Sequence, residues 1–251
     1  MSHKRVLAGV LLVALLALAG CSSVLGPEPV DHAALRENET YDWQTGVNAS
    51  ITITGSEYEA VYNMSDTSKF VVYSRDGLGR EHPLSISALK FRYPNGTVVN
   101  ASSPALNATN NEHETVIFLP AKNGKLAFSA PAPGKRFATR TFVTGSYEVT
   151  IPKNMRVEYV PLARVSPPGY ETRRTETGQV LIHWDDVQSD AVIVRYYLAR
   201  DIYIFAAGAA VLVLIALGGT LYYLRQIREL ERRRRDAGPD VDTGDDDGPG
   251  L

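Results

Sequence analysis

The sequence has a single cysteine, Cys21, near its amino terminus. A chain without a second cysteine cannot form an intramolecular disulfide. Any exported domain after position 21 must therefore gain its stability from a buried core, from strand pairing and from attached glycans. Familiar catalytic motifs are also missing, because the sequence has no Gly-x-Ser-x-Gly, no Walker loop and no Cys-x-x-Cys. No enzyme class is favoured by these motifs.

A surplus of charge of one sign is missing from the body of the chain. The formal net charge is -2, and residues 22–200 carry 18 Lys and Arg against 19 Asp and Glu. A surface that binds nucleic acid needs a basic excess. We therefore expect no nucleic-acid partner, and no sequence pattern indicates a cofactor.

Long hydrophobic runs occur only twice, and the first covers residues 6–19 after the basic pair Lys4-Arg5. It is shorter than the roughly 20 residues of a membrane span and is typical of a signal peptide, which we predict at residues 1–20. The following Leu18-Ala19-Gly20-Cys21 resembles the lipobox of prokaryotic lipoproteins. That resemblance implies cleavage before Cys21 and lipidation of this cysteine. The alternative is cleavage elsewhere, with Cys21 incidental.

The second hydrophobic run covers residues 202–224 and contains no charged side chain. At 1.5 Å per residue it would form a helix of roughly 34 Å, enough to cross a hydrocarbon core of about 30 Å. Tyr203 and Tyr222-Tyr223 stand near its two ends, where aromatic rings favour the membrane interface. The sequence therefore predicts one transmembrane α-helix at residues 201–224.

A basic cluster follows this run at once and consists of Arg225, Arg228, Arg232, Arg233, Arg234 and Arg235. Basic residues favour the cytosolic side, so we expect a single-pass protein of the cell membrane with its ectodomain outside and residues 225–251 cytosolic. The cluster also attracts anionic headgroups, which makes membrane lipid an expected partner. Opposite charges four residues apart favour a helical extension into the tail. Gly238-Pro239 should end this helix, and the Asp-rich remainder is predicted to be disordered.

Between the two runs the pattern is that of short strands separated by turns. Residues 49–54 alternate between apolar and polar side chains. Asp76-Gly77, Asn95-Gly96 and Asn123-Gly124 are strong tight-turn signals between apolar runs, and Gly145-Ser146 predicts a further hairpin. Strands are expected at residues 49–54, 58–63, 70–73, 89–93, 97–99, 116–119, 125–128, 137–143, 147–151, 156–160, 171–175, 180–184 and 191–198.

These strands predict a mostly β fold, with a β-sandwich-like ectodomain at residues 46–200. One continuous sandwich and two small β-units are both compatible with the pattern, and Pro-Ala-Pro-Gly at 131–134 is the candidate boundary. Residues 21–45 are weakly patterned and are interpreted as an anchor and spacer. The last strand leads into Asp201 without a linker, so the C-terminal half is expected at the bilayer surface.

Six Asn-x-Ser/Thr sequons predict a glycosylated exterior, because each acceptor needs an exposed site. They begin at Asn38, Asn48, Asn63, Asn95, Asn100 and Asn107, all within the first 110 residues. The alternative is that Asn, Ser and Thr simply enrich polar turns. Glycans on the first half would leave residues 120–200 bare for protein contacts.

Two short segments carry reactive side chains. Ser87-Ala88-Leu89-Lys90 matches the Ser-x-x-Lys of serine acyl-enzymes, but the companion motifs are absent and the segment has a strand pattern. His183-Trp184-Asp185-Asp186 offers metal-ligating types, although a core Trp followed by a turn is the simpler interpretation. We therefore predict no catalytic residue and no metal ligand.

The lipobox, the dense sequons, the excess of Arg over Lys and the Asp-rich tail are together similar to exported haloarchaeal proteins. With His82-Pro83, Arg92-Tyr93-Pro94-Asn95-Gly96 and the segment at 195–201, the layout resembles an uncharacterised haloarchaeal family of lipobox-bearing envelope proteins with a C-terminal transmembrane helix. The resemblance covers most of the chain and implies no activity. The near-neutral ectodomain departs from the acidic surface of many halophile proteins.

The leading hypothesis is a non-enzymatic envelope protein that binds or scaffolds a partner protein at the outer face of the membrane. One alternative is a membrane-anchored extracytoplasmic hydrolase whose site is assembled from distant residues. Another is a signalling or assembly subunit that acts through the Arg-rich tail.

Overall fold

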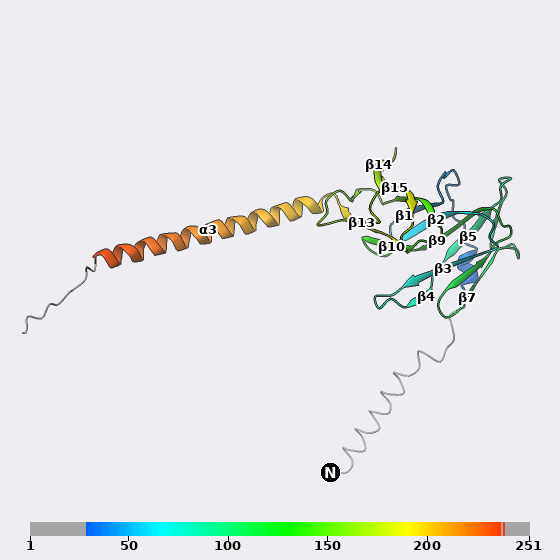
Figure 1. Ribbon diagram of the computed structural model, residues 1–251, viewed down its shortest axis with the longest axis horizontal. Coiled ribbons are helices and arrows are strands. Elements are labelled where there is room, and N and C mark those ends of the chain that lie inside the picture. The colour runs from blue at the N-terminus through cyan, green and yellow to red at the C-terminus, as the bar shows by residue number, and fades with distance from the viewer. Residues whose placement is uncertain (1–28, 237, 239–251) are drawn as a thin grey trace, which may run out of the picture. The chain divides into compact units, whose positions relative to one another are not determined.

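Figure 1 shows the computed structural model, which describes residues 29–236 and Gly238. The chain divides into two compact units, one up to Leu198 and one from Ala199 onward. From residue 29 onward the first unit is built of strands and one short helix, and the second contains a long apolar helix. The prediction of a mostly β fold with one C-terminal apolar helix is confirmed. The predicted signal peptide, Cys21 and the tail beyond Gly238 lie outside the described residues.

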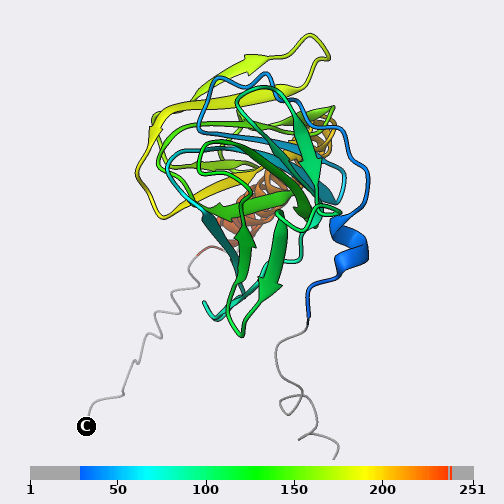
Figure 2. The same ribbon diagram turned by 90° about the vertical axis from the view of Figure 1, so that its right-hand side faces the viewer.

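Strands form the body of the first unit (Figures 1 and 2). The largest sheet has eight strands in the order β14-β15-β11-β1-β2-β9-β5-β6. Neighbouring strands in this sheet run antiparallel, except β1 and β11, which run parallel. The strands are β1 (Ala49–Thr54), β2 (Glu57–Met64), β5 (Ser87–Arg92), β6 (Val98–Asn100), β9 (Gly124–Pro131), β11 (Gly145–Thr150), β14 (Glu171–Arg174) and β15 (Val180–Val187).

Three smaller sheets complete the unit, with the orders β4-β3-β8-β7, β10-β16-β13 and β12-β17. Their strands are β3 (Lys69–Arg75), β4 (Glu81–Pro83), β7 (Asn107–Asn110), β8 (Thr115–Phe118), β10 (Arg136–Arg140), β12 (Met155–Arg156), β13 (Arg164–Ser166), β16 (Ala191–Arg195) and β17 (Tyr197–Leu198). The strand predicted at residues 156–160 is wrong beyond Arg156, and β4, β7 and β13 lack a clear signal in the sequence.

The core lies between the eight-stranded sheet and the smaller sheets. On β2, Tyr58 packs edge-on against Phe137 of β10, with ring centroids 5.1 Å apart. The ring centroid of Tyr62 on the same strand lies 5.0 Å from that of Phe70 on β3. One central strand thus contacts two of the smaller sheets, which gives a sandwich. Residues 131–134 join β9 to β10 inside this single compact unit.

The hairpin predicted at Asn95-Gly96 is confirmed, because β5 pairs with β6 and Gly96 has a φ of +91°. The one predicted around Asn123-Gly124 is wrong, since β8 pairs with β3 and β7 whereas β9 pairs with β2 and β5. The one predicted around Gly145-Ser146 is also wrong, since β10 pairs with β16 and β11 with β1 and β15. In both cases the turn carries the chain from one sheet to another.

The second unit contains helix α3 (Asp201–Asp236). It is long and apolar enough to cross a membrane, with a mean hydropathy of 2.4 over an 18-residue window. The helix continues past Leu224 through the exposed arginine cluster that was predicted to extend it. Arg233 there donates to a carboxylate oxygen of Glu229 at 2.6 Å, one of the predicted pairs four residues apart.

Candidate binding site

Residues 29–45, the N-terminal strap, pack on the face of the eight-stranded sheet that points away from the core. Tyr41 is 4% exposed and forms a cluster with Val61 of β2, Ala88 of β5 and Ala127 of β9, against which Trp43 also packs. The interpretation of residues 21–45 as a spacer is therefore wrong for this part. The strap is held by single apolar side chains, which leave no periodic pattern in the sequence.

Hydrogen bonds donated by the strap and by the sheet hold the two together. The Tyr41 hydroxyl donates to the carbonyl oxygen of Ala88 at 2.8 Å and lies 3.0 Å from the Ser129 hydroxyl. Burial raises the pKa of Tyr41 well above its ordinary value. From the sheet, the Lys125 amine donates to the carbonyl oxygens of Trp43 at 2.8 Å and Thr45 at 2.7 Å. The strap is thus an integral part of the sandwich.

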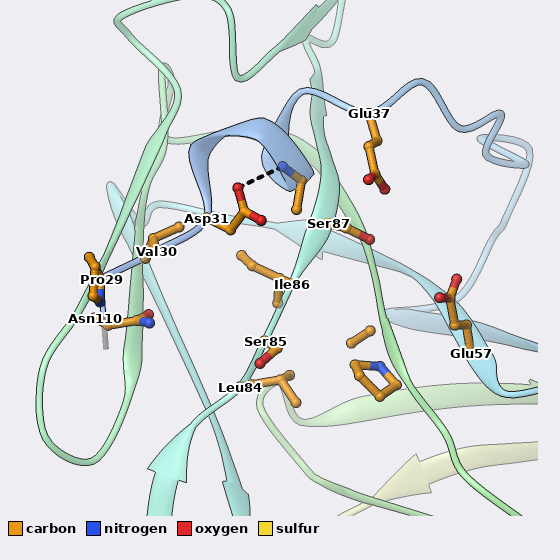
Figure 3. Close-up of a pocket in the computed structure, with 13 residues that line it drawn as sticks. Pro29, Val30, Asp31, Glu37, Glu57, Leu84, Ser85, Ile86, Ser87 and Asn110 are labelled. Carbon is orange, nitrogen blue, oxygen red and sulfur yellow. Dashed lines mark hydrogen bonds between the residues drawn. The ribbon is translucent and has the colours of Figure 1, made fainter. Parts of the chain in front are cut away.

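A cleft of about 390 Å³ lies where the first part of the strap meets the connection into β5 (Figure 3). The strap contributes helix α2 (His32–Leu35), whose first turn is capped by Asp31. The Asp31 carboxylate accepts hydrogen bonds from the backbone N–H groups of Ala33 at 2.8 Å and Ala34 at 3.1 Å. The described lining residues are Pro29, Val30, Asp31, Ala34, Glu37, Glu57, Leu84, Ser85, Ile86, Ser87, Asn110, Ala130 and Pro131.

The polar groups of the cleft are carboxylates, serine hydroxyls and an amide. Its described lining includes no imidazole, amine or thiol that could act as a base toward Ser87. Lys90, which completes the Ser-x-x-Lys match, instead donates to the amide oxygen of Asn38 at 2.8 Å and to the carbonyl oxygen of Glu39. This chemistry suits binding of a hydrogen-bond donor or a cationic group.

His183 lies outside the cleft, on the same sheet face as the strap but on β15. Its Nδ1 is 3.2 Å from a carboxylate oxygen of Glu148 on β11, and its Nε2 is 3.1 Å from one of Asp185. Glu171 of β14 is in register with His183 on the other side. The following Trp184 is 1% exposed, which confirms it as a core residue. Within the described residues, no group of three His, Cys, Asp or Glu could hold a metal ion.

We call this outward surface of β1, β11, β15 and β14 the open face, because the Tyr41 cluster of the strap contacts β2, β5 and β9 instead. It is polar, and Ser50, Glu148, His183 and Glu171 follow one another in register across its four strands. Antiparallel strands such as β11, β15 and β14 commonly have one face exposed to solvent. The open face therefore presents acidic and imidazole groups that a partner could contact.

The candidate glycosylation sites are spread over the strap and several strands, and Asn48 adjoins β1 and β11 of the open face. Asn38, Asn63, Asn95 and Asn107 are exposed, and Asn48 and Asn100 are half-buried. They lie on the strap, just before β1, on β2, in the β5–β6 turn, on β6 and on β7. Asn48 has a structural role, because its amide oxygen accepts from the backbone N–H of Ser146 at 3.1 Å and from its hydroxyl at 3.0 Å.

Residues 45–242 match the model of a family described as "Family of unknown function (DUF5803)". No curated protein matches the chain. The matched segment includes every β-strand of the described residues and helix α3. The expectation of an uncharacterised family agrees with this result. Because the match covers more than half of the sequence, the chain belongs to the DUF5803 family of unknown function.

Proposed function

We propose that this chain is a non-enzymatic, single-pass protein of the cell envelope whose sandwich binds a partner protein at the outer face of the membrane. In this proposal the sandwich is extracytoplasmic, the C-terminus is cytosolic, and Cys21 carries a lipid. The basic cluster after the apolar run supports the orientation through the positive-inside rule. The lipobox resemblance supports the lipid, and a haloarchaeal source would fit the sequon density.

One observation carries the proposal: the strand order puts the candidate glycan acceptors Asn95 and Asn100 near the edge of the sheet that is farthest from the open face. Asn100 lies on β6 at one edge of the eight-stranded sheet, and β14 forms the other edge. With neighbouring strands about 4.8 Å apart, these edges are separated by roughly 34 Å along the sheet. Glycans on the β6 side would therefore leave the open face accessible.

The open face also has the chemistry for a specific contact. Glu148, Glu171 and Asp185 surround His183 there, and Arg173 of β14 forms an ion pair with Glu171, so the surface has a net acidic charge. Complementary charge on a partner would speed association and fix its register. We therefore propose a partner protein that presents basic side chains to this face.

Photo-crosslinking in native membranes tests the proposal. A benzophenone amino acid placed at Leu181 on the open face should capture one recurring protein, and the same residue placed at Val98 on β6 should not. The double change Glu148→Gln and His183→Gln should abolish the Leu181 product while leaving the amount of membrane-bound chain unchanged. Equal products from Leu181 and Val98, or none from Leu181, would overturn the proposal.

A further inference from the structure

Three arginines from distant parts of the sequence stand side by side on the three-stranded sheet. Arg136 of β10 is directly opposite Arg195 of β16, and Arg195 is directly opposite Arg164 of β13. Residues directly opposite each other on antiparallel strands share one face, with Cβ atoms about 5 Å apart. We call these three residues the arginine row.

The arginine row faces outward. The next residues along two of the strands, Phe137 and Val194, are 2% and 0% exposed, so they point into the core. Alternation along a strand then directs Arg136 and Arg195 away from it, and all three arginines are exposed. Within the described part of the chain none of them forms an ion pair.

A row of like charges costs stability, because repulsion between directly opposite residues destabilises a sheet. Among the described residues no ion pair offsets that cost for the arginine row. Guanidinium groups bind phosphate oxygens in a bidentate manner, and several together form a phosphate-binding surface. The row therefore has the composition of a site for anionic phosphate groups.

An exposed apolar turn ends at the arginine row. Residues 157–163 connect β12 to β13, and the backbone N–H groups of Leu162 and Ala163 both donate to the carbonyl oxygen of Tyr159 at 3.0 and 2.9 Å. This closes a tight turn that leaves Val160 82% exposed and Tyr159 37% exposed. Arg164 follows directly after the turn. An apolar tip beside cationic side chains is the composition of a membrane-interface segment.

The turn at residues 157–163 is connected through β12 and β17 to the start of helix α3. The turn starts from β12, where Met155 pairs with Leu198 of β17. Only Ala199 and Arg200 separate Leu198 from Asp201, where α3 begins. The chain therefore leads from β17 into α3 through a connection of only two residues.

We infer that the arginine row and the turn at Val160 form a site for the phosphate headgroups of anionic lipids in the membrane that α3 spans. The arginines bind the phosphates, and Val160 enters the interfacial layer beside them. The inference rests on the membrane anchoring in the proposed function and adds a lipid-binding surface to it. The site belongs to the folded sandwich and is separate from the arginine cluster at 225–235.

The experiment uses the full chain with Cys21→Ser and Val160→Cys, labelled at position 160 with an environment-sensitive nitrobenzoxadiazole fluorophore. The chain is reconstituted into vesicles of phosphatidylcholine alone or of an equimolar mixture with phosphatidylglycerol. We expect the emission to shift to the blue in the mixture and to stay unshifted in phosphatidylcholine. Each single Arg→Gln change in the row should weaken the response to anionic lipid about fivefold.

A charge-matched control separates the site from general electrostatics. The triple variant Arg136→Gln, Arg164→Gln, Arg195→Gln should lose the shift, whereas Arg80→Gln, Arg173→Gln, Arg174→Gln should keep it. Identical behaviour of the two triple variants, or equal emission in both vesicles, would overturn the inference. Alkaline carbonate extraction of the same samples tests the anchoring by α3 on its own.

A thermal unfolding curve of the triple variant tests whether the arginine row has a structural role. Since the row contains only like charges, its triple variant should unfold at the same temperature as the parent or at a higher one. A clearly lower unfolding temperature would show that these arginines stabilise the fold and would contradict the inference.

Discussion

The hydroxyl of Tyr41 donates a 2.8 Å hydrogen bond to the carbonyl oxygen of Ala88, a residue on β5 with a φ of +48°. A side chain other than glycine rarely adopts this left-handed conformation, and it occurs here at an irregularity in the β5–β9 pairing between Ser87 and Lys90. The strap thus satisfies a carbonyl group at the point where the regular ladder is interrupted.

Removing this hydroxyl should weaken the sandwich. Tyr41→Phe leaves the Ala88 carbonyl and the Ser129 hydroxyl without their shared partner in a buried cluster, so we expect a loss of about 1–3 kcal/mol in the free energy of unfolding. Urea denaturation of the full chain in detergent, followed by tryptophan fluorescence, measures it. Tyr170→Phe, whose hydroxyl makes no described hydrogen bond, serves as the control, and equal losses would refute the assignment.

Gly124 should tolerate no side chain. A Cβ at this position would lie 2.5 Å from the Phe91 ring and 2.6 Å from the carbonyl oxygen of Arg92. Gly124→Ala should therefore destabilise the unit by about 1–3 kcal/mol through overpacking. Gly77→Ala is the matched control, because nothing lies within 4 Å of its Cβ position. The comparison of the two urea midpoints is decisive, and an unchanged midpoint for Gly124→Ala would contradict the predicted clash.

Asn48 should behave differently from the exposed sequon asparagines. Its amide oxygen joins the start of β1 to Ser146 on β11, so Asn48→Ala should cost about 1–3 kcal/mol of stability. Asn63 is exposed, and Asn63→Ala should stay within about 0.5 kcal/mol of the parent. Glycopeptide mass spectrometry should find position 48 unmodified while sugar occupies exposed sequons. A fully glycosylated Asn48 would show that its side chain is released from Ser146.

Alkaline pH should destabilise the first unit above about pH 10. Burial raises the pKa of Tyr147 from 10.0 to about 12, and it also raises the pKa values of Tyr58 and Tyr62. Since the unfolded chain then loses these protons more readily than the folded one, the stabilisation is complete below pH 10 and is lost as pH rises toward 12. Melting curves between pH 9 and pH 11 check this, and a constant unfolding temperature would be incompatible with it.

Membrane retention should survive loss of the lipid candidate. Cys21→Ser removes the predicted acylation site but leaves α3, and a transmembrane helix anchors far more strongly than acyl chains. We expect the variant to remain in the membrane fraction after alkaline carbonate extraction. Metabolic labelling with a radioactive fatty or isoprenoid precursor reports the modification itself. Release of the variant into the medium would show that α3 does not span the membrane.

Sequence patterns predict the parts of this fold that local contacts decide. The alternation at 49–54 predicts the bounds of β1, and Asn95-Gly96 predicts the β5–β6 hairpin. The hairpin around Gly145-Ser146 fails because β11 pairs in parallel with β1, 98 positions earlier. A parallel pair needs a long crossover, and no short-range signal identifies its partner.

The binding surfaces are harder to predict because they depend on register. In the sequence Arg136, Arg164 and Arg195 stand far apart, and only the pairing of three strands aligns them. The strap is equally hidden, since Tyr41 acts through partners far along the chain. The apolar run of α3 needs no such information, because length and composition alone give the span.

The parallel pairing of β1 with β11 has a consequence for synthesis. The ribosome delivers β1 and β2 early, and they can pair at once, but the other edge of β1 stays unpaired until Thr150 has emerged. An open strand edge is a template for aggregation. We therefore expect this edge of β1 to need protection for nearly a hundred residues of elongation, until β11 is available to pair with it.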